Sequence, residues 1–263
     1  MSYSNEYQAP SLRQRLYSVW FRHIRVYCSN FFSNAFPPFV EPLIFLVSLG
    51  LGLGAYIQNM GNVNYVLFLA SGLIVTSAMF SASFECTYGT FIRLEFDYIY
   101  DGMLGAPLSA SNLIIGEILF VATKGFFFSL AVLSITWIAG IIRYPLSLLT
   151  PFVGFLTGLV FGSLAIFITS KVNNINHFNF YFTGLISPMF FFSGVVFPLE
   201  NLAPVLRGIA EVIPLTHLVR LVRALCIPGT MGTGLLLDLL YVAVFIGVFG
   251  LLAIRGFRSR LIQ

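Results

Sequence analysis

Charged side chains are scarce in this sequence of 263 residues. Aspartate, glutamate, lysine and arginine make up 9% of it, whereas a soluble domain carries about 25%. Cysteine is sparse too: Cys28, Cys86 and Cys226 are widely spaced and form no CxxC pair or Cys/His cluster. We interpret all three as small apolar fillers and expect no metal site. The first 37 residues also lack the apolar run of a cleavable signal peptide.

Apolar residues are correspondingly abundant. They make up 58% of the chain, and the mean hydropathy is +0.90. One soluble core could not hide this much apolar surface, whereas a bilayer accepts it as a solvent would. The net charge of +4 fits cytoplasmic loops that face anionic lipid, and it is poor support for a nucleic-acid partner.

The hydropathy pattern predicts an all-α integral membrane protein with one membrane domain over residues 1–263. Each long apolar run offers roughly the 20 residues that a helix needs to cross about 30 Å of hydrocarbon. Runs such as Phe126–Phe128 and Phe190–Phe192 do not alternate with polar residues, which argues against a β-barrel. The six predicted transmembrane helices are Phe39–Ile57, Tyr65–Phe84, Leu113–Ile142, Leu146–Ser170, Phe178–Phe197 and Leu235–Ile254.

Lysine and arginine outside these spans predict the orientation. Nine fall on the side that carries both termini, and four fall on the opposite side. Positive residues gather on the cytoplasmic side of membrane proteins. We therefore expect a multi-pass protein with both termini in the cytoplasm.

The stretch 11–27 predicts an amphipathic helix before the first span, with Ser11 as its N-cap. Apolar residues recur at helical spacing, and Arg15, Arg22 and Arg25 lie on another face. A basic helix that carries Trp20 lies along a membrane surface rather than crossing it. We expect it to be an interfacial anchor in contact with membrane lipid.

The cytoplasmic connection from Glu85 to Asn112 is too long for a simple turn. A short helix fits within it, mixing aromatic and aliphatic residues with Glu95, Asp97 and Asp101, and Gly105 and Pro107 end that helix. Such a helix suits insertion into the groove of a partner protein. The alternative is a helix lying on lipid, but an anionic leaflet would repel three carboxylates.

Two stretches carry a resemblance to a known family. The first is Phe84-Glu85-x-x-Tyr88-Gly89-Thr90-Phe91-Ile92-Arg93, followed by Met103-Leu104-x-Ala106-Pro107-Leu108 and Gly116-Glu117. The second runs from Ser187 to Pro198, with Pro214-Leu215-Thr216-His217 after it. Together they resemble the type-2 ABC exporter permeases, and within them the nodulation-factor exporters known as nodulation protein J. The similarity covers nearly the whole chain in the right order.

The resemblance implies a homodimer in the bacterial inner membrane, joined to two separate ATPase subunits that hold MgATP. It implies ATP-driven export of an amphipathic glycolipid, lipo-oligosaccharide or polysaccharide. It also implies that a coupling helix over residues 91–104 contacts the ATPase through Arg93, Glu95, Asp97, Tyr98, Asp101 and Leu104. The residues themselves agree that this chain is not an enzyme and needs no cofactor, because it has no GxxxxGK[ST] loop around Lys124 or Lys171.

The outer segment 198–230 is apolar but is interrupted by prolines. Two short helices fit, Leu202–Ile213 and Thr216–Cys226, with Thr216 capping the second. They match the re-entrant helices of the family. His217, Arg220 and Arg223 recur every three residues on the second helix, where they could meet a phosphate. The favoured alternative is that the arginines snorkel and set the depth of the helix.

Ionisable residues at membrane depth form the last group of candidates. Charges there are costly and usually face a cavity or a partner. Glu117 and Lys124 lie two turns apart in the third span, so each should pair with another helix, and Arg93 is a candidate partner for Glu117. Glu85 borders the second span and joins them as a candidate for translocation or gating. Glu41, Asp238 and Glu85 itself lie near span ends, so the alternative interpretation of all three is as ordinary interfacial residues.

Several other functions remain open or disfavoured at this point. An exporter of drugs or small lipids fits the same residues. A nucleotide-independent channel or secondary transporter would show more buried charges and often repeat symmetry. A membrane scaffold leaves the outer segment unexplained. An importer permease is disfavoured because the EAA…G loop is missing, and no cluster of residues suggests a membrane-embedded enzyme.

Overall fold

The computed structural model describes residues 10–57, 59–60 and 63–261, and within them the chain is almost entirely helical. Long apolar stretches favour helices in a bilayer because a helix satisfies all of its backbone hydrogen bonds internally. Its longer helices are α1 (Leu12–Ser29), α2 (Phe31–Gly52), α3 (Tyr65–Phe84), α6 (Ala110–Ile138), α7 (Thr150–Thr169), α11 (Pro214–Cys226) and α12 (Leu235–Leu261). The shorter helices are α4 (Thr90–Glu95), α5 (Ile99–Leu104), α8 (Phe178–Tyr181), α9 (Ser187–Phe192) and α10 (Pro204–Ala210).

Other local structures join these helices. A two-stranded antiparallel hairpin, β1 (Asn59–Met60) with β2 (Val63–Asn64), connects α2 to α3. Two π-helical turns, η1 (Glu85–Gly89) and η4 (Phe182–Ile186), lie between α3 and α4 and between α8 and α9. Three 3₁₀ turns are η2 (Pro145–Leu149), η3 (Ile175–His177) and η5 (Leu199–Asn201).

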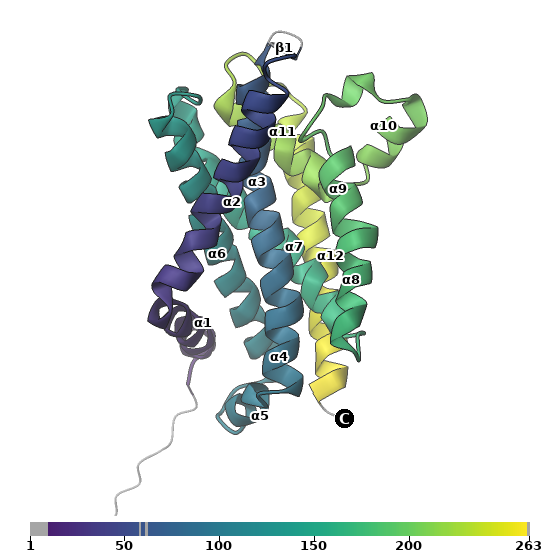
Figure 1. Cartoon of the computed structure of the whole chain (residues 1–263). Coiled ribbons are helices and arrows are strands. Elements are labelled where there is room, and N and C mark those ends of the chain that lie inside the picture. Colours follow the sequence, from purple (N-terminus) through teal and green to yellow (C-terminus); the bar gives the residue numbers. More distant parts are fainter. Residues whose placement is uncertain (1–9, 58, 61–62, 262–263) are drawn as a thin grey trace, which may run out of the picture.

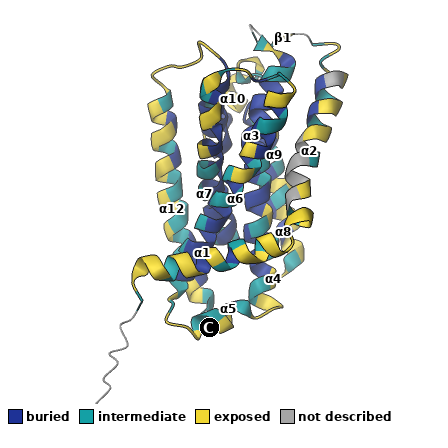
Figure 2. Cartoon of the chain, turned by 90° about the vertical axis from the view of Figure 1, so that its left-hand side faces the viewer, coloured by how far each residue is buried: buried dark blue, intermediate teal, exposed yellow. Residues whose placement is uncertain are grey.

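The long helices stand side by side as an upright bundle (Figure 1). The end that carries α4, α5 and the C-terminus is called the α5 end, and the end that carries the hairpin and α10 is called the α10 end. Helix α1 lies across the bundle near the α5 end, roughly perpendicular to the upright helices (Figure 2). The N-terminal helix, the predicted docking segment and the C-terminal end of α12 thus share one end of the molecule, and the side of the membrane that this end faces stays a prediction.

Four helical stretches among the described residues are long and apolar enough to cross a membrane: Tyr65–Glu95, Ala110–Ile138, Pro145–Thr169 and Leu235–Leu261. They correspond to the second, third, fourth and sixth predicted spans. The fifth predicted span is a composite of α8, η4 and α9, which end at Phe192 after about 21 Å. The first corresponds to α2, part of whose side chains, including that of Glu41, lies outside the described residues. The count of six therefore stays a prediction.

Several predicted boundaries were wrong, in both directions: some helices continue past the ends of the hydropathy runs, whereas α2 ends at Gly52 rather than at Ile57. Helix α2 begins at Phe31 rather than Phe39, and α12 continues to Leu261 rather than ending at Ile254. Helix α6 ends at Ile138, inside the stretch predicted to contain the third span, because the chain turns at Gly140 with a backbone φ of 68°. The N-cap at Ser11 is confirmed: its side chain accepts a hydrogen bond from the backbone N–H of Gln14.

Helix α3 occupies the centre of the bundle and buries most of its residues on all sides. Helices α6 and α7 cross each other closely beside it, and small residues make this possible. A Cβ atom placed on Gly158 would lie 2.6 Å from the Cα of Ala122, and one placed on Gly125 would lie 2.6 Å from the carbonyl oxygen of Gly154. Close backbone approach through small residues is the usual packing of membrane helices. This rigid crossing positions the charged residues of α6 described next.

Candidate functional site

The helix that begins at Tyr65 does not end with the apolar run at Phe84. It continues through the π turn η1 into α4, so the predicted connection is helical from Glu85 up to Glu95, including the six residues before the predicted coupling helix. A π turn contains one residue more than an α turn, which rotates the side chains that follow it around the helix axis. As a result Glu85 and Arg93 meet, with 2.8 Å between Arg93 Nη1 and Glu85 Oε1. The other carboxylate oxygen of Glu85 lies 2.8 Å from Lys124 Nζ on α6.

Glu117 on α6 is the centre of the charged cluster and is 0% exposed. Its Oε1 accepts hydrogen bonds from Arg93 Nη2 at 2.5 Å and Thr90 Oγ1 at 2.6 Å, and its Oε2 accepts one from the Tyr100 hydroxyl at 2.6 Å. The predicted pairing of Glu117 with Arg93 is therefore present. One buried carboxylate joins α6 to both α4 and α5. We call Glu85, Thr90, Arg93, Tyr100, Glu117 and Lys124 the Glu117 network.

Tyr100 is the member of the Glu117 network that the sequence did not reveal. It is fully buried at the start of α5 and packs edge-on against Phe257 of α12. Burial, together with the negative charge of Glu117, raises its pKa well above the ordinary value, so the hydroxyl remains a hydrogen-bond donor. Tyr100 follows Arg93 by seven residues, and this spacing was the only signal in the sequence that could have linked the two. The helix breaks between them, and the sequence does not reveal that break.

The predicted coupling helix over 91–104 is two helices rather than one. Helix α4 ends at Glu95, the chain turns at 96–98, and α5 then runs from Ile99 to Leu104. Tyr98 makes this turn with φ 51°, a left-handed conformation that non-glycine residues seldom adopt. Arg93 consequently belongs to the buried network and does not lie on a docking surface. Its predicted place there was wrong, because the helix continues through η1.

The remaining predicted contact residues do lie on the surface of the α5 end. Asp97, Tyr98 and Asp101 are exposed, and Leu104 is half-buried. We call these four residues the α5 surface. Glu95 is exposed too, but its carboxylate pairs with Arg260 of α12 at 2.9 Å. Arg260 also donates to the backbone carbonyl of Thr169 at the end of α7, a contact that a charge count alone could not reveal.

The predicted cations of the outer segment are all engaged by internal partners at the α10 end. His217 Nδ1 lies 2.6 Å from Asp238 Oδ1, and its ring stacks on Tyr241. Arg220 pairs with both Asp238 and Glu211, and its hydrogen bond lowers the pKa of Glu211. Asp238 is thus a buried partner, and its interpretation as an ordinary interfacial residue was wrong.

Arg223 is held differently, within the bundle. Its Nη2 donates to the carbonyl of Gly194 at 2.6 Å, and its guanidinium lies 3.6 Å from the centre of the Phe68 ring. Both suggested roles for the three cations, phosphate binding and snorkelling, assumed side chains that were free to reach outward. The structure instead shows them fixing α11 to its neighbours.

The outer helices also begin and end at other residues than predicted. Helix α10 is Pro204–Ala210 and α11 starts at Pro214. Proline suits the first turn of a helix because its missing N–H needs no partner there. The prediction that Thr216 is the N-cap was therefore wrong, and its hydroxyl donates to the carbonyl of Ala210 instead.

The chemistry available to these clusters is ionic and structural. Within the described part of the chain, no group of three or more His, Cys, Asp or Glu side chains could hold a metal ion. The carboxylates of the Glu117 network are all committed to hydrogen bonds or ion pairs. Such a network can fix the relative positions of three helices and transmit a displacement from one to the next.

Comparison with known proteins gives a consistent result. The profile of the family described as "ABC-2 type transporter" matches residues 14–227. Nodulation protein J of Rhizobium leguminosarum bv. trifolii is 37% identical over 210 residues, which cover 78% of this chain and 79% of the relative. Nodulation protein J of Rhizobium meliloti is 32% identical over 244 residues, covering 91% and 88%. The inner membrane transport permease YadH of Escherichia coli is 20% identical over 204 residues, covering 78% and 79%.

Proposed function

The chain belongs to the ABC-2 type transporter family, and on that premise we propose that it is the non-catalytic permease subunit of an ATP-driven exporter. Membership of this family implies a bacterial inner-membrane protein with an ABC ATPase as its partner. In our proposal two copies of the chain form the translocation pathway, and two separate ATPase subunits bind MgATP. Both termini and the α5 end then face the cytoplasm.

The observation that carries this proposal is the connection between the α5 surface and Glu117. Tyr100 of α5 and Arg93 of α4 donate to the two oxygens of the same buried carboxylate on α6. An ATPase that pushes on the α5 surface would therefore move α6 through hydrogen bonds rather than through a flexible loop. A fully paired buried network is rigid, which suits transmission of movement.

Charge reversal on the α5 surface tests the docking role. Asp97 and Asp101 predict a basic rim on the ATPase groove, since complementary charge guides association. We expect Asp101→Lys to weaken co-purification of the ATPase at least tenfold, about 1.4 kcal/mol, and to lower ATP hydrolysis by the complex. Glu200→Lys is the matched control, because Glu200 is exposed on η5 at the α10 end. Equal effects of the two variants would contradict docking through α5.

The proposed cargo is an amphipathic glycolipid, lipo-oligosaccharide or polysaccharide. The support is the similarity to several proteins named nodulation protein J over most of their length. A drug or small-lipid exporter is the alternative, and stimulation of ATP hydrolysis separates the two. In vesicles that contain both subunits, lipo-oligosaccharide should raise the hydrolysis rate and cationic dyes should not. Stimulation by dyes alone would assign the drug-type cargo.

A further inference from the structure

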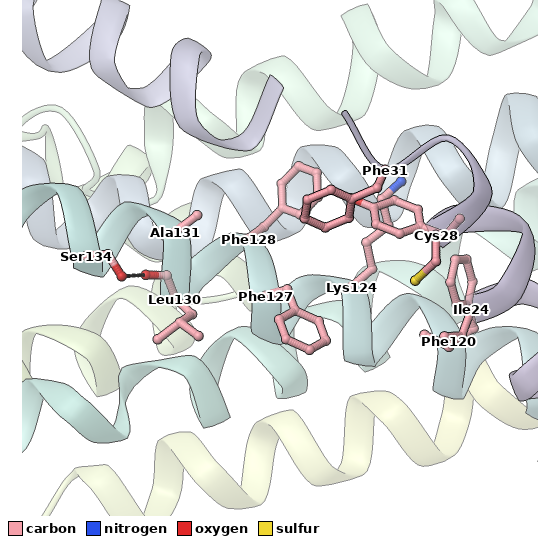
Figure 3. Close-up of a pocket in the computed structure, with 11 residues that line it drawn as sticks. Ile24, Cys28, Phe31, Phe120, Lys124, Phe127, Phe128, Leu130, Ala131 and Ser134 are labelled. Carbon is pink, nitrogen blue, oxygen red and sulfur yellow. Dashed lines mark hydrogen bonds between the residues drawn. The ribbon is translucent and has the colours of Figure 1, made fainter. Parts of the chain in front are cut away.

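A groove on the side of the bundle is not used by the Glu117 network or by the α5 surface. Its volume is about 420 Å³, and it lies where the junction of α1 and α2 passes beside α6. Tyr27, Cys28 and Phe31 line it from the junction, and Phe127, Phe128 and Lys124 line it from α6 (Figure 3). Apart from Lys124 the lining is nearly all apolar, so the groove suits a hydrocarbon chain rather than a sugar.

The groove follows α6 over several turns. Its lining extends from Phe120 to Ser134, which at 1.5 Å per residue is about 21 Å. The hydrocarbon of one leaflet is about 15 Å thick, half of the bilayer value. An acyl chain that entered beside α1 would therefore remain against α6 for the whole depth of a leaflet.

Charge at the α1 end of the groove identifies the headgroup. The Lys124 ammonium has three N–H donors, of which one bonds to Glu85, and it lies 5.4 Å and 5.5 Å from the centres of the Tyr27 and Phe128 rings. Helix α1 carries four arginines and no acidic residue, and two of them, Arg22 and Arg25, line a neighbouring hollow on α1 rather than the groove itself. Basic residues at this level attract the anionic lipids of the cytoplasmic leaflet.

We propose that this groove binds one acyl chain of an anionic phospholipid, with the phosphate at the α1 end of the groove beside Lys124. The lipid would join the α1–α2 junction to α6 and so hold the anchor helix against the network-bearing helix. This site is independent of the cargo and of the ATPase. Failure of the proposed function would leave it unaffected, because the permease alone is expected to bind the lipid.

Photolabelling of the full-length permease tests the site. The probe is a phosphatidylglycerol whose acyl chain carries a diazirine, present at a small mole fraction in phosphatidylcholine vesicles. We expect labelled peptides to concentrate on 127–134 of α6 and 27–31 of the junction. Ala131→Trp, at a lining residue that is 5% exposed, should reduce that labelling several-fold. Val244→Trp, on the exposed face of α12, is the control and should leave it unchanged.

A second variant and a second lipid complete the labelling experiment. Cys28→Phe narrows the groove at an exposed rim residue, so it serves if Ala131→Trp does not fold. A photoreactive phosphatidylcholine with the same acyl chain should label the groove several-fold less than the phosphatidylglycerol. Equal labelling by the two lipids would overturn the anionic headgroup. Labelling spread evenly over α6 and α12, or unchanged by both filling variants, would overturn the site.

Discussion

The side chain of Glu117 is buried, so water cannot replace the groups that hydrogen-bond to it. Every hydrogen bond that its carboxylate accepts therefore helps to hold α4, α5 and α6 together. The carboxylate is satisfied by an arginine, a threonine and a tyrosine from two other helices. A buried ion pair is weak support for stability as a whole, but removal of one partner leaves an uncompensated charge. The role of Glu117 at the residue scale is therefore to specify one arrangement of these helices.

Glu117→Gln should destabilise the permease by about 3 kcal/mol, because Arg93 then loses a buried ionic partner. Thermal unfolding in detergent measures the loss, and Glu200→Gln on the exposed turn is the control. The double replacement Arg93→Met with Glu117→Leu should recover much of the stability, since no unpaired charge remains. An unchanged melting temperature for Glu117→Gln would contradict the network.

His23 on α1 gives the permease a pH-dependent stability. Burial lowers the pKa of His23 from 6.5 to about 4, so the side chain is neutral at pH 7. The unfolded chain binds the proton more readily than the folded protein does. The contribution of neutral, buried His23 to the free energy of unfolding is therefore complete above pH 6.5 and is lost as the pH falls towards 4. The loss is on the order of 3 kcal/mol for this shift of about 2.5 pKa units. Melting temperatures of the wild type and His23→Phe should diverge over that window, and parallel curves would contradict the assignment.

At the scale of the elements, the sequence predicted which segments are helical better than it predicted π turns and breaks within those segments. Hydropathy located α3, α6, α7 and α12, because twenty apolar residues leave few alternatives in a membrane. It could not reveal η1, whose residues differ from an ordinary helix only in hydrogen-bond register. That turn moved Arg93 from the predicted docking helix into the buried network.

The turn between α4 and α5 stores strain at Tyr98. A left-handed tyrosine costs about 1–2 kcal/mol, and asparagine tolerates this conformation better. We expect Tyr98→Asn to stabilise the isolated permease by up to about 1 kcal/mol and to weaken ATPase binding, since an exposed aromatic contact is lost. Unfolding of the permease and co-purification of the ATPase measure the two effects. Loss of stability together with unchanged binding would contradict a docking role for this turn.

The crossing of α6 and α7 depends on small residues. Gly158→Ala brings a methyl group against the Ala122 backbone and should cost about 1–3 kcal/mol, as overpacking does. Gly247→Ala in α12 has open space at the same position and should be neutral or stabilising by up to about 1 kcal/mol. Thermal unfolding of the two variants compares them directly, and equal effects would contradict the close crossing.

At the scale of the whole molecule, the two ends of the bundle carry different sets of charged residues. The α5 end combines the basic helix α1, the acidic α5 surface and the end of α12 (Figure 1). The sequence predicted this grouping through its charges and its family resemblance. It could not predict that His217 and Arg220 share Asp238, because α11 and α12 are brought together only by the fold.

We propose that this chain moves an amphiphile only when a partner ATPase drives it. The most direct measurement is flux of a fluorescent lipo-oligosaccharide across proteoliposomes that contain the permease with or without the ATPase. We expect flux only when both subunits and MgATP are present, and we expect Asp101→Lys but not Glu200→Lys to abolish that flux. Flux through the permease alone, without nucleotide, would contradict ATP-driven export and identify a channel or secondary transporter.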